Sequence, residues 1–144
     1  MKRHAEAQWS GPVETGQGTL ALGSKTFSGP YSFKGRNDGS GTNPEELIGA
    51  AHAGCFTMAL SSRLTQAGYT PQGLVTTATV HLTATPAGFR IPTIELATQA
   101  SVPGINEQEF QELAQLAKEN CPVSVALSGV EITLDAALVE AVAS

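Results

Sequence analysis

The hydrophobic and polar positions between residues 41 and 68 predict one long helix. Asn43 is a favourable N-cap, Pro44 suits the first helical position, and Gly68 is a natural stop at the far end. Large apolar side chains spread around this helix instead of forming one stripe: Leu47, Ile48, Phe56, Met58 and Leu60. Because a helix that is apolar on all sides is usually buried, the pattern predicts a long central helix inside the fold.

The first forty residues favour short strands separated by turns. The expected strands are residues 4–9, 19–22, 25–27 and 31–36. A Gly-Ser dipeptide at 23–24 indicates a hairpin between the second and third of these strands. The loop 37–41 then leads into the long helix.

Residues 74–85 alternate between apolar and polar positions, which predicts a half-buried antiparallel strand. One of its faces carries Leu74, Thr76, Ala78, Val80, Leu82 and Ala84. Residues 89–102 are expected to form the returning strand, and Pro92 indicates an edge or a bulge near the start of that strand.

The last third of the chain predicts two helices and one strand. Asn106 is placed to cap a helix that ends at Asn120, and Pro122 suits the first position of a short helix, which makes Cys121 its N-cap. Residues 130–134 are expected to be a strand, followed by a fraying tail over 136–144. This order of elements predicts an α+β fold with antiparallel sheets around the long helix.

Composition narrows the class of protein. The 144 residues are enough for one domain with a real core but not for two, so a single domain over 1–144 is expected. A net charge of -5 argues against binding to nucleic acid or to an anionic membrane surface. Lys2 and Arg3 are not followed by an apolar signal core, and no run could span a bilayer, so we expect a cytoplasmic protein.

The two cysteines, Cys55 and Cys121, allow more than one interpretation. Two buried thiols that serve as packing residues are the simplest one, and a permanent disulfide is not expected in a reducing cytosol. An N-cap position favours the thiolate of Cys121. Cys55 lies about 16 Å along the helix from Pro44, too far to gain from the dipole, and burial would raise its pKa. A nucleophilic Cys55 therefore needs a nearby cation, and the run that leads into the helix offers Lys34 and Arg36.

His52 precedes Cys55 by three residues, on the same face of the helix. The pair could form half of a metal site, but His4, His81 and Cys121 are the only other soft ligands in the chain. A hydrogen-bonded core histidine is the preferred interpretation, and no metal or cofactor is expected. The sequence contains no Ser-His-Asp order and no nucleotide-binding fingerprint.

Several segments together resemble one protein family. The segment GTNPEELIGAAHAGCF (41–56) resembles the signature of the OsmC/Ohr family, which comprises osmotically inducible protein C and the organic hydroperoxide resistance proteins. ENCPVS (119–124) resembles the second cysteine motif of that family, and the flanking segments 30–36, 102–105 and 131–136 are also similar. The histidine-containing form at 50–56 resembles the OsmC branch.

The resemblance implies an OsmC-like fold and a thiol peroxidase. Cys55 matches the peroxidatic cysteine, and Cys121 matches the resolving cysteine that forms a disulfide with it. Arg36 matches the activating arginine and Glu45 its carboxylate partner, with Glu46 as second choice. The implied substrate is a hydroperoxide, in defence against oxidative and osmotic stress. We expect organic hydroperoxides to react faster than hydrogen peroxide, because the apolar neighbours of Cys55 could bind an alkyl group. A dithiol such as dihydrolipoamide, or a lipoylated protein, is the implied reductant.

An intertwined homodimer is a further hypothesis. Glu45 and Cys55 are ten residues apart, about 15 Å along one helix, so they cannot meet within it. Two copies crossing antiparallel at the small residues 49–51 could bring them together. Leu47, Phe56 and Met58 are candidates for an apolar pocket, although they are equally suited to core packing. Open alternatives are a non-enzymatic binding or stress protein, a thiol redox sensor and an acyl-thiol hydrolase.

Overall fold

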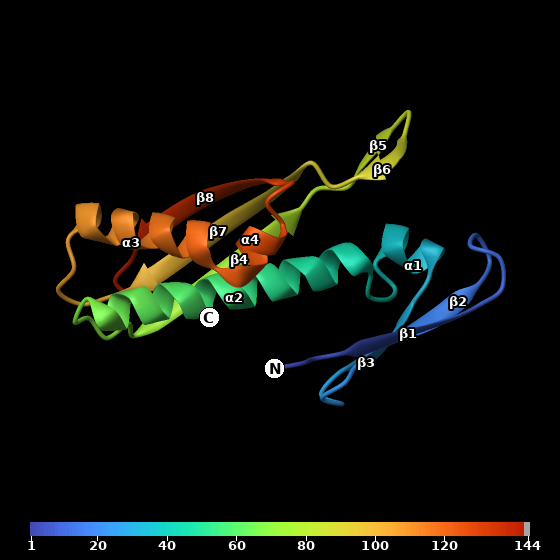
Figure 1. The fold of residues 1–144 in the computed structure, drawn as a ribbon, viewed down its shortest axis with the longest axis horizontal. Helices are drawn as coiled ribbons and strands as arrows, with labels where there is room; N and C mark the ends of the chain where they lie inside the picture. Colours follow the sequence, from blue (N-terminus) through green and yellow to red (C-terminus); the bar gives the residue numbers. More distant parts are fainter. Residues whose placement is uncertain (143–144) are drawn as a thin grey trace. The chain divides into compact units, whose positions relative to one another are not determined.

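The computed structural model describes residues 1–142 (Figure 1). The chain divides into two compact units, Met1–Leu47 and Ile48–Ser144. The prediction of one domain over 1–144 remains a prediction. Within residues 1–142, no helix has both the length and the apolar character that crossing a membrane requires.

The first unit contains a three-stranded antiparallel sheet in the order β1-β2-β3. Its strands are β1 (Ala5–Ser10), β2 (Gln17–Leu22) and β3 (Ser28–Tyr31). The predicted edge strand at 4–9 is therefore confirmed as β1. The expected strand at 25–27 is wrong, because those residues belong to the connection between β2 and β3, where Lys25 adopts a positive φ of 63°.

The expected strand at 31–36 is also wrong, because the chain turns into helix α1 (Phe33–Asp38). Ser32 caps this helix by accepting a hydrogen bond from the backbone N–H of Gly35 at 2.8 Å. Gly39 ends it in the left-handed conformation with φ 75°, which glycine adopts without strain. The local capping signals thus outweigh the strand-forming aromatic residues that precede them.

Helix α2 (Pro44–Gln66) follows, with the boundaries expected from its capping residues. The side chain of Asn43 accepts a hydrogen bond from the backbone N–H of Glu46 at 2.7 Å, and Gly68 has a φ of 93° just beyond the helix. In this single chain the helix is not buried all round, contrary to the expectation. It buries one face, formed by Gly49, His52, Phe56, Leu60 and Leu64, whereas Met58 is 76% exposed.

The second unit is a sheet packed against helices on one face. Its strands are β4 (Gly73–Val80), β7 (Thr93–Ser101) and β8 (Glu131–Leu138), in the order β4-β7-β8. Helices α3 (Glu107–Asn120) and α4 (Pro122–Ala126) connect β7 to β8. The buried core combines α2, α3 and the sheet through Phe56, Leu60, Leu64, Leu96, Ala100, Phe110, Ala114, Ala117 and Ala136.

Three details of this unit differ from the sequence expectation, although the α+β class is confirmed. The pair β7–β8 is parallel, because the helical crossover returns the chain to the end of the sheet where β7 began. The predicted strands 74–85 and 89–102 are each interrupted, so that β5 (Thr83–Thr85) and β6 (Gly88–Arg90) form a separate hairpin. Pro92 lies at the second interruption, as its position suggested. The expected tail contributes to β8 as far as Leu138; residues 143–144 lie outside the described residues.

Candidate active site

Cys121 lies at the junction between α3 and α4. It is the C-cap of α3 and the N-cap of α4, and its sulfur accepts a hydrogen bond from the backbone N–H of Ser124 at 3.3 Å. Burial opposes ionisation of this thiol, but hydrogen bonds with Ser124, with Cys55 and with the backbone of Val123 together hold the pKa of Cys121 below its ordinary value. The prediction of an N-cap cysteine is confirmed.

Cys55 is half-buried on α2, and neither cysteine is engaged in a disulfide. Burial is the main cause that raises the pKa of Cys55, the backbone N–H of Val123 counteracts it, and Cys121 adds to the rise. The side chains of Cys55 and Cys121 lie close enough for each thiol to shift the pKa of the other. In this chain alone the pKa of Cys121 is lowered and that of Cys55 is raised, and a nearby cation would favour the thiolate of Cys55.

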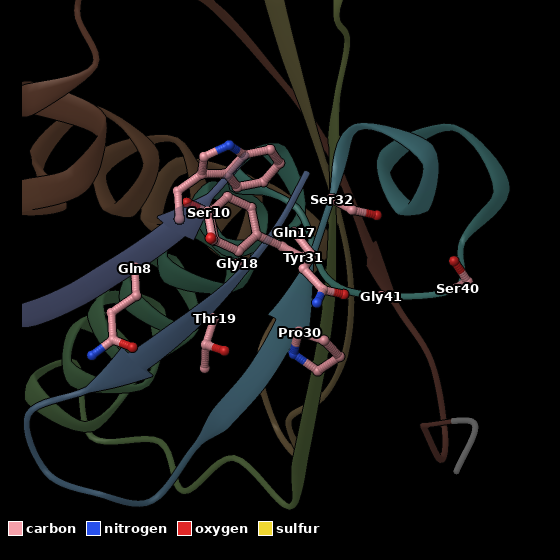
Figure 2. A pocket seen from close by; sticks show the side chains of 11 residues that line it. Gln8, Ser10, Gln17, Gly18, Thr19, Pro30, Tyr31, Ser32, Ser40 and Gly41 are labelled. Atoms are coloured by element: carbon pink, nitrogen blue, oxygen red, sulfur yellow. The ribbon is translucent and has the colours of Figure 1, made fainter. Parts of the chain in front are cut away.

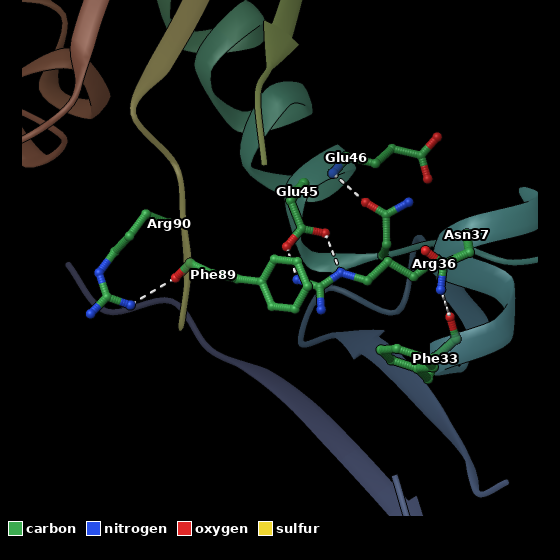
Figure 3. Close-up of polar contacts among 8 residues, drawn as sticks. Phe33, Arg36, Asn37, Glu45, Glu46, Phe89 and Arg90 are labelled. Carbon is green, nitrogen blue, oxygen red and sulfur yellow. Dashed lines mark hydrogen bonds and ion pairs between the residues drawn. The ribbon is translucent and has the colours of Figure 1, made fainter. Parts of the chain in front are cut away.

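Arg36 and Glu45 form a two-pronged ion pair within the first unit (Figure 3). The Nε–H of Arg36 donates to Glu45 Oε2 at 3.0 Å, and a terminal nitrogen of the guanidinium donates to Oε1. The hydrogen bonds hold the pKa of Glu45 below its usual value and raise the pKa of Arg36. The side chains of Arg36 and Glu45 are 30% and 12% exposed, so the ion pair is only partly open to solvent.

Glu46 makes different contacts from Glu45. It accepts a hydrogen bond from the hydroxyl of Thr42 at 3.0 Å, and Figure 3 shows its carboxylate pointing away from Arg36. Of the two carboxylates considered from the sequence, Glu45 is therefore the partner of Arg36 in this structure.

His52 is a fully buried neighbour of the cysteine pair. Its Nε2 lies 2.8 Å from the hydroxyl of Ser124, and that hydroxyl lies 3.3 Å from the sulfur of Cys121. Burial lowers the pKa of His52, which keeps the imidazole neutral. The expectation of a hydrogen-bonded core histidine is confirmed. The sequence did not identify its partner Ser124. A usable signal was present, because Ser124 is three residues after the N-cap Cys121 and residues with this spacing are neighbours on a helix.

The part of the chain that the structure describes contains no cluster of three or more metal-ligating side chains. Phe56 was considered as a pocket wall, but it is completely buried in the core and cannot line an accessible site. That candidate is therefore wrong. Met58 remains accessible.

The first unit also has a hollow of about 550 Å³ beside its sheet (Figure 2). The rings of Trp9 and Tyr31 stand 5.3 Å apart and are tilted by 59° in its lining, together with Gln8, Gln17 and Ser32. Neither Arg36 nor Glu45 lines this hollow, so it is separate from their ion pair.

Two thiols close enough to shift each other's pKa are typical of thiol-based redox proteins, and the comparisons with known proteins support that class. Residues 37–135 match the family described as OsmC-like protein, a range that begins one residue after Arg36. The chain therefore belongs to the OsmC-like family.

Individual relatives support the same family. The chain is 48% identical to "Peroxiredoxin OsmC" of Escherichia coli strain K12 over 137 residues, which cover 94% of this chain and 95% of that protein. It is 37% identical to an "Organic hydroperoxide resistance protein" of Xanthomonas axonopodis pv. citri over 98 residues, or 67% of each. A crystal structure of an organic hydroperoxide resistance protein OsmC from Legionella pneumophila matches with a TM-score of 0.70 and 26% identity, covering 93% of this chain and 96% of that one.

Proposed function

We propose that this chain is a cysteine-dependent peroxidase that reduces organic hydroperoxides, and hydrogen peroxide more slowly, in cytoplasmic defence against oxidative and osmotic stress. The adjacency of Cys55 and Cys121 carries the proposal, because a two-cysteine peroxidase requires a second thiol within reach of the first. The names of the relatives from Escherichia coli and Xanthomonas, a peroxiredoxin and a hydroperoxide resistance protein, support the same activity.

In the proposed reaction the thiolate of Cys55 attacks the O–O bond of the hydroperoxide. The alkoxide leaves as an alcohol after taking up a proton, and Cys55 becomes a sulfenic acid. The sulfur of Cys121 then displaces the hydroxyl group, which forms a disulfide and releases water. A dithiol, proposed to be dihydrolipoamide or a lipoylated protein, reduces the disulfide by thiol–disulfide exchange.

Arg36 and Glu45 are proposed to complete the site of a second copy of the chain. The surface of α2 opposite its core face presents small and apolar side chains, namely Ala50, Ala51, Gly54 and Met58. In an antiparallel crossing centred on Ala50, the position equivalent to Glu45 is Cys55. The guanidinium held by Glu45 would then supply the cation that Cys55 lacks.

The position of Gly49 refines this hypothesis of a homodimer. A Cβ at Gly49 would come within 3.3 Å of the carbonyl oxygen of Ala78, so this glycine allows α2 to approach its own sheet. Gly54, in contrast, has no neighbour within 4 Å of a would-be Cβ. We therefore keep the crossing centred on Ala50 and assign the contact between copies to the exposed face that carries Ala50, Ala51 and Gly54, and not to Gly49.

Mixing two inactive variants tests the shared site. We expect Cys55→Ala and Arg36→Ala chains, refolded together, to regain about a quarter of the wild-type activity, because half of the dimers are mixed and each has one intact site. Peroxidase assays of the mixture and of each variant refolded alone measure the recovery. If sites are confined to single chains, the mixture stays inactive.

A coupled assay with dihydrolipoamide and its dehydrogenase tests the proposed activity and substrate. We expect kcat/KM for cumene hydroperoxide to exceed that for hydrogen peroxide by at least about tenfold. Burial of only two carbon atoms of cumene hydroperoxide would contribute about 1.6 kcal/mol to transition-state binding. Hydrogen peroxide has no carbon atoms and cannot gain this contribution. Equal or reversed values would contradict the organic preference, and no turnover of either peroxide would contradict the function itself.

A further inference from the structure

A buried chain of hydrogen-bonding groups leads from α2 to the resolving cysteine. His52 is 0% exposed, and its Nε2 contacts the hydroxyl of Ser124 across a sequence separation of 72 residues. The same hydroxyl contacts Cys121 Sγ, which also accepts the backbone N–H of Ser124. Among the described residues, the other ring nitrogen of His52, Nδ1, is a buried polar atom without a partner.

Burying Nδ1 of His52 without a hydrogen-bond partner lowers the stability of the folded state. An apolar residue at position 52 would avoid that cost. Because the proposed steps at Cys55 do not use His52, its burial beside Ser124 needs a separate explanation.

The hydrogen-bond geometry restricts what each group can do. The hydroxyl of Ser124 has one hydrogen and two neighbours, His52 Nε2 and Cys121 Sγ. If Nε2 carries the imidazole hydrogen and donates it to Ser124, the hydrogen of Ser124 is free to point at the sulfur. The sulfur of Cys121 then accepts two hydrogen bonds, one from the hydroxyl and one from the backbone N–H of Ser124. Hydrogen bonds to the charged form of a group favour ionisation.

We infer that His52 and Ser124 are positioning residues that hold Cys121 as a thiolate aimed at the sulfenic acid of Cys55. His52 acts through Ser124, by fixing the direction of its hydroxyl hydrogen. The stabilised thiolate of Cys121 does not depend on the proposed peroxidase function. The attack on the sulfenic acid of Cys55 does rest on that function.

The reaction that this arrangement promotes is balanced. The thiolate of Cys121 attacks the sulfur of the Cys55 sulfenic acid, a S–S bond forms and the S–O bond breaks. Hydroxide leaves and takes up the proton that Cys121 released when it ionised, giving water. The oxidising equivalents come from the hydroperoxide that oxidised Cys55, so no further oxidant is required.

The other ionisable groups around Cys121 do not explain its acidity. Helix α4 contains none, and α2 contributes Cys55 and His52, of which the Cys55 thiol is a weaker influence than Ser124. The last turn of α3 carries Lys118 and Glu119, neither of which is among the groups that shift the pKa of Cys121. The donors of Ser124 are therefore the main stabilising influence.

The test measures the acidity of Cys121 without peroxide. In a Cys55→Ser background, Cys121 is the only thiol, and its ionisation is followed by ultraviolet absorbance of the thiolate and by its alkylation rate against pH. We expect Ser124→Ala and His52→Leu each to lower the thiolate fraction about tenfold at a pH below the pKa, as loss of one hydrogen bond to a charged group implies. His52→Gln, whose amide nitrogen can replace Nε2 as donor, is expected to restore most of that fraction.

A second measurement uses the chain with both cysteines and one equivalent of cumene hydroperoxide. We expect Ser124→Ala to leave sulfenic acid formation at Cys55 unchanged and to slow disulfide formation about tenfold, which lengthens the time over which dimedone can trap the intermediate. Thermal unfolding of every variant establishes that it is folded; if His52→Leu is not, Ser124→Ala and His52→Gln carry the comparison.

The two proposals fail in different ways. An unchanged titration of Cys121 in Ser124→Ala overturns the inference, whether or not the chain is a peroxidase. If His52→Leu and His52→Gln lower the thiolate fraction of Cys121 equally, the proposed role of His52 is overturned, because altered packing alone would explain both results. A chain that shows the expected titrations but in which peroxide leaves Cys55 unoxidised contradicts the proposed function instead.

Discussion

The Cys55→Ser variant is expected to lose at least about a thousandfold in peroxidase activity, the largest effect of any single substitution in this chain. A serine hydroxyl does not ionise at neutral pH and is a far weaker nucleophile than a thiolate toward the O–O bond. Stopped-flow measurement of peroxide consumption, with the dithiol present, gives the rate.

The Cys121→Ser variant is the matched control, because it makes the same substitution at the other cysteine. It is expected to consume the first equivalent of hydroperoxide at nearly the wild-type rate and then to stall. Without a resolving thiol the sulfenic acid persists, and excess peroxide oxidises it to the sulfinic acid, detectable by mass spectrometry. A Cys121→Ser variant that never reacts, together with a Cys55→Ser variant that reacts once and stalls, would reverse the two roles, and normal turnover by Cys55→Ser would contradict the mechanism.

The Arg36→Met variant is expected to react with cumene hydroperoxide about a hundredfold more slowly at pH 7. Burial already raises the pKa of Cys55, and loss of a nearby cation would leave that rise uncompensated. Since a cation favours the thiolate, its removal moves the pH profile of the reaction toward higher pH. The second-order rate constant of Cys55 oxidation, measured from pH 5 to pH 10, separates this displacement from a loss of folded protein.

Lys34→Met is the control for Arg36→Met, because it removes a positive charge from the same helix α1. The Lys34 side chain is 84% exposed and lies 3.8 Å from Asp38, a surface contact of little energetic value. We expect its pH profile to match the wild type. Arg36→Lys is expected to be intermediate, since it keeps the charge but not the two-pronged contact with Glu45. An Arg36→Met profile that coincides with that of Lys34→Met would contradict the activating role.

Sequence reasoning succeeded where the determining signals are local. Asn43, Pro44 and Gly68 set the ends of α2, and Cys121-Pro122 predicted the start of α4, because capping depends on residues within one turn. The same kind of signal was overlooked at Ser32, where a capping serine begins α1 immediately after a strand.

Properties that depend on distant residues could not be derived in this way. The parallel pairing of β7 with β8 depends on how α3 and α4 return the chain, and the contact of His52 with Ser124 joins positions 72 residues apart. No periodicity in one segment carries that information. The apolar residues spread around α2 were a correct observation with a wrong conclusion, because one face is buried by this chain and another is left exposed.

The pairing of Arg36 with Glu45 instead of Glu46 was decided by geometry that the sequence does not contain. Both carboxylates lie in the first turn of α2, but only one of them faces α1, and the hydroxyl of Thr42 engages the other. The resemblance to a known family supplied the candidate pair, and the structure shows which carboxylate is placed to make it.

A thiol titration before and after one equivalent of cumene hydroperoxide tests the central claim most directly. Because Cys55 and Cys121 lie close enough to shift each other's pKa, we expect a loss of two thiols per chain and a disulfide within the chain, identified by peptide mapping. Retention of both thiols, or loss of Cys121 while Cys55 stays reduced, would contradict the account.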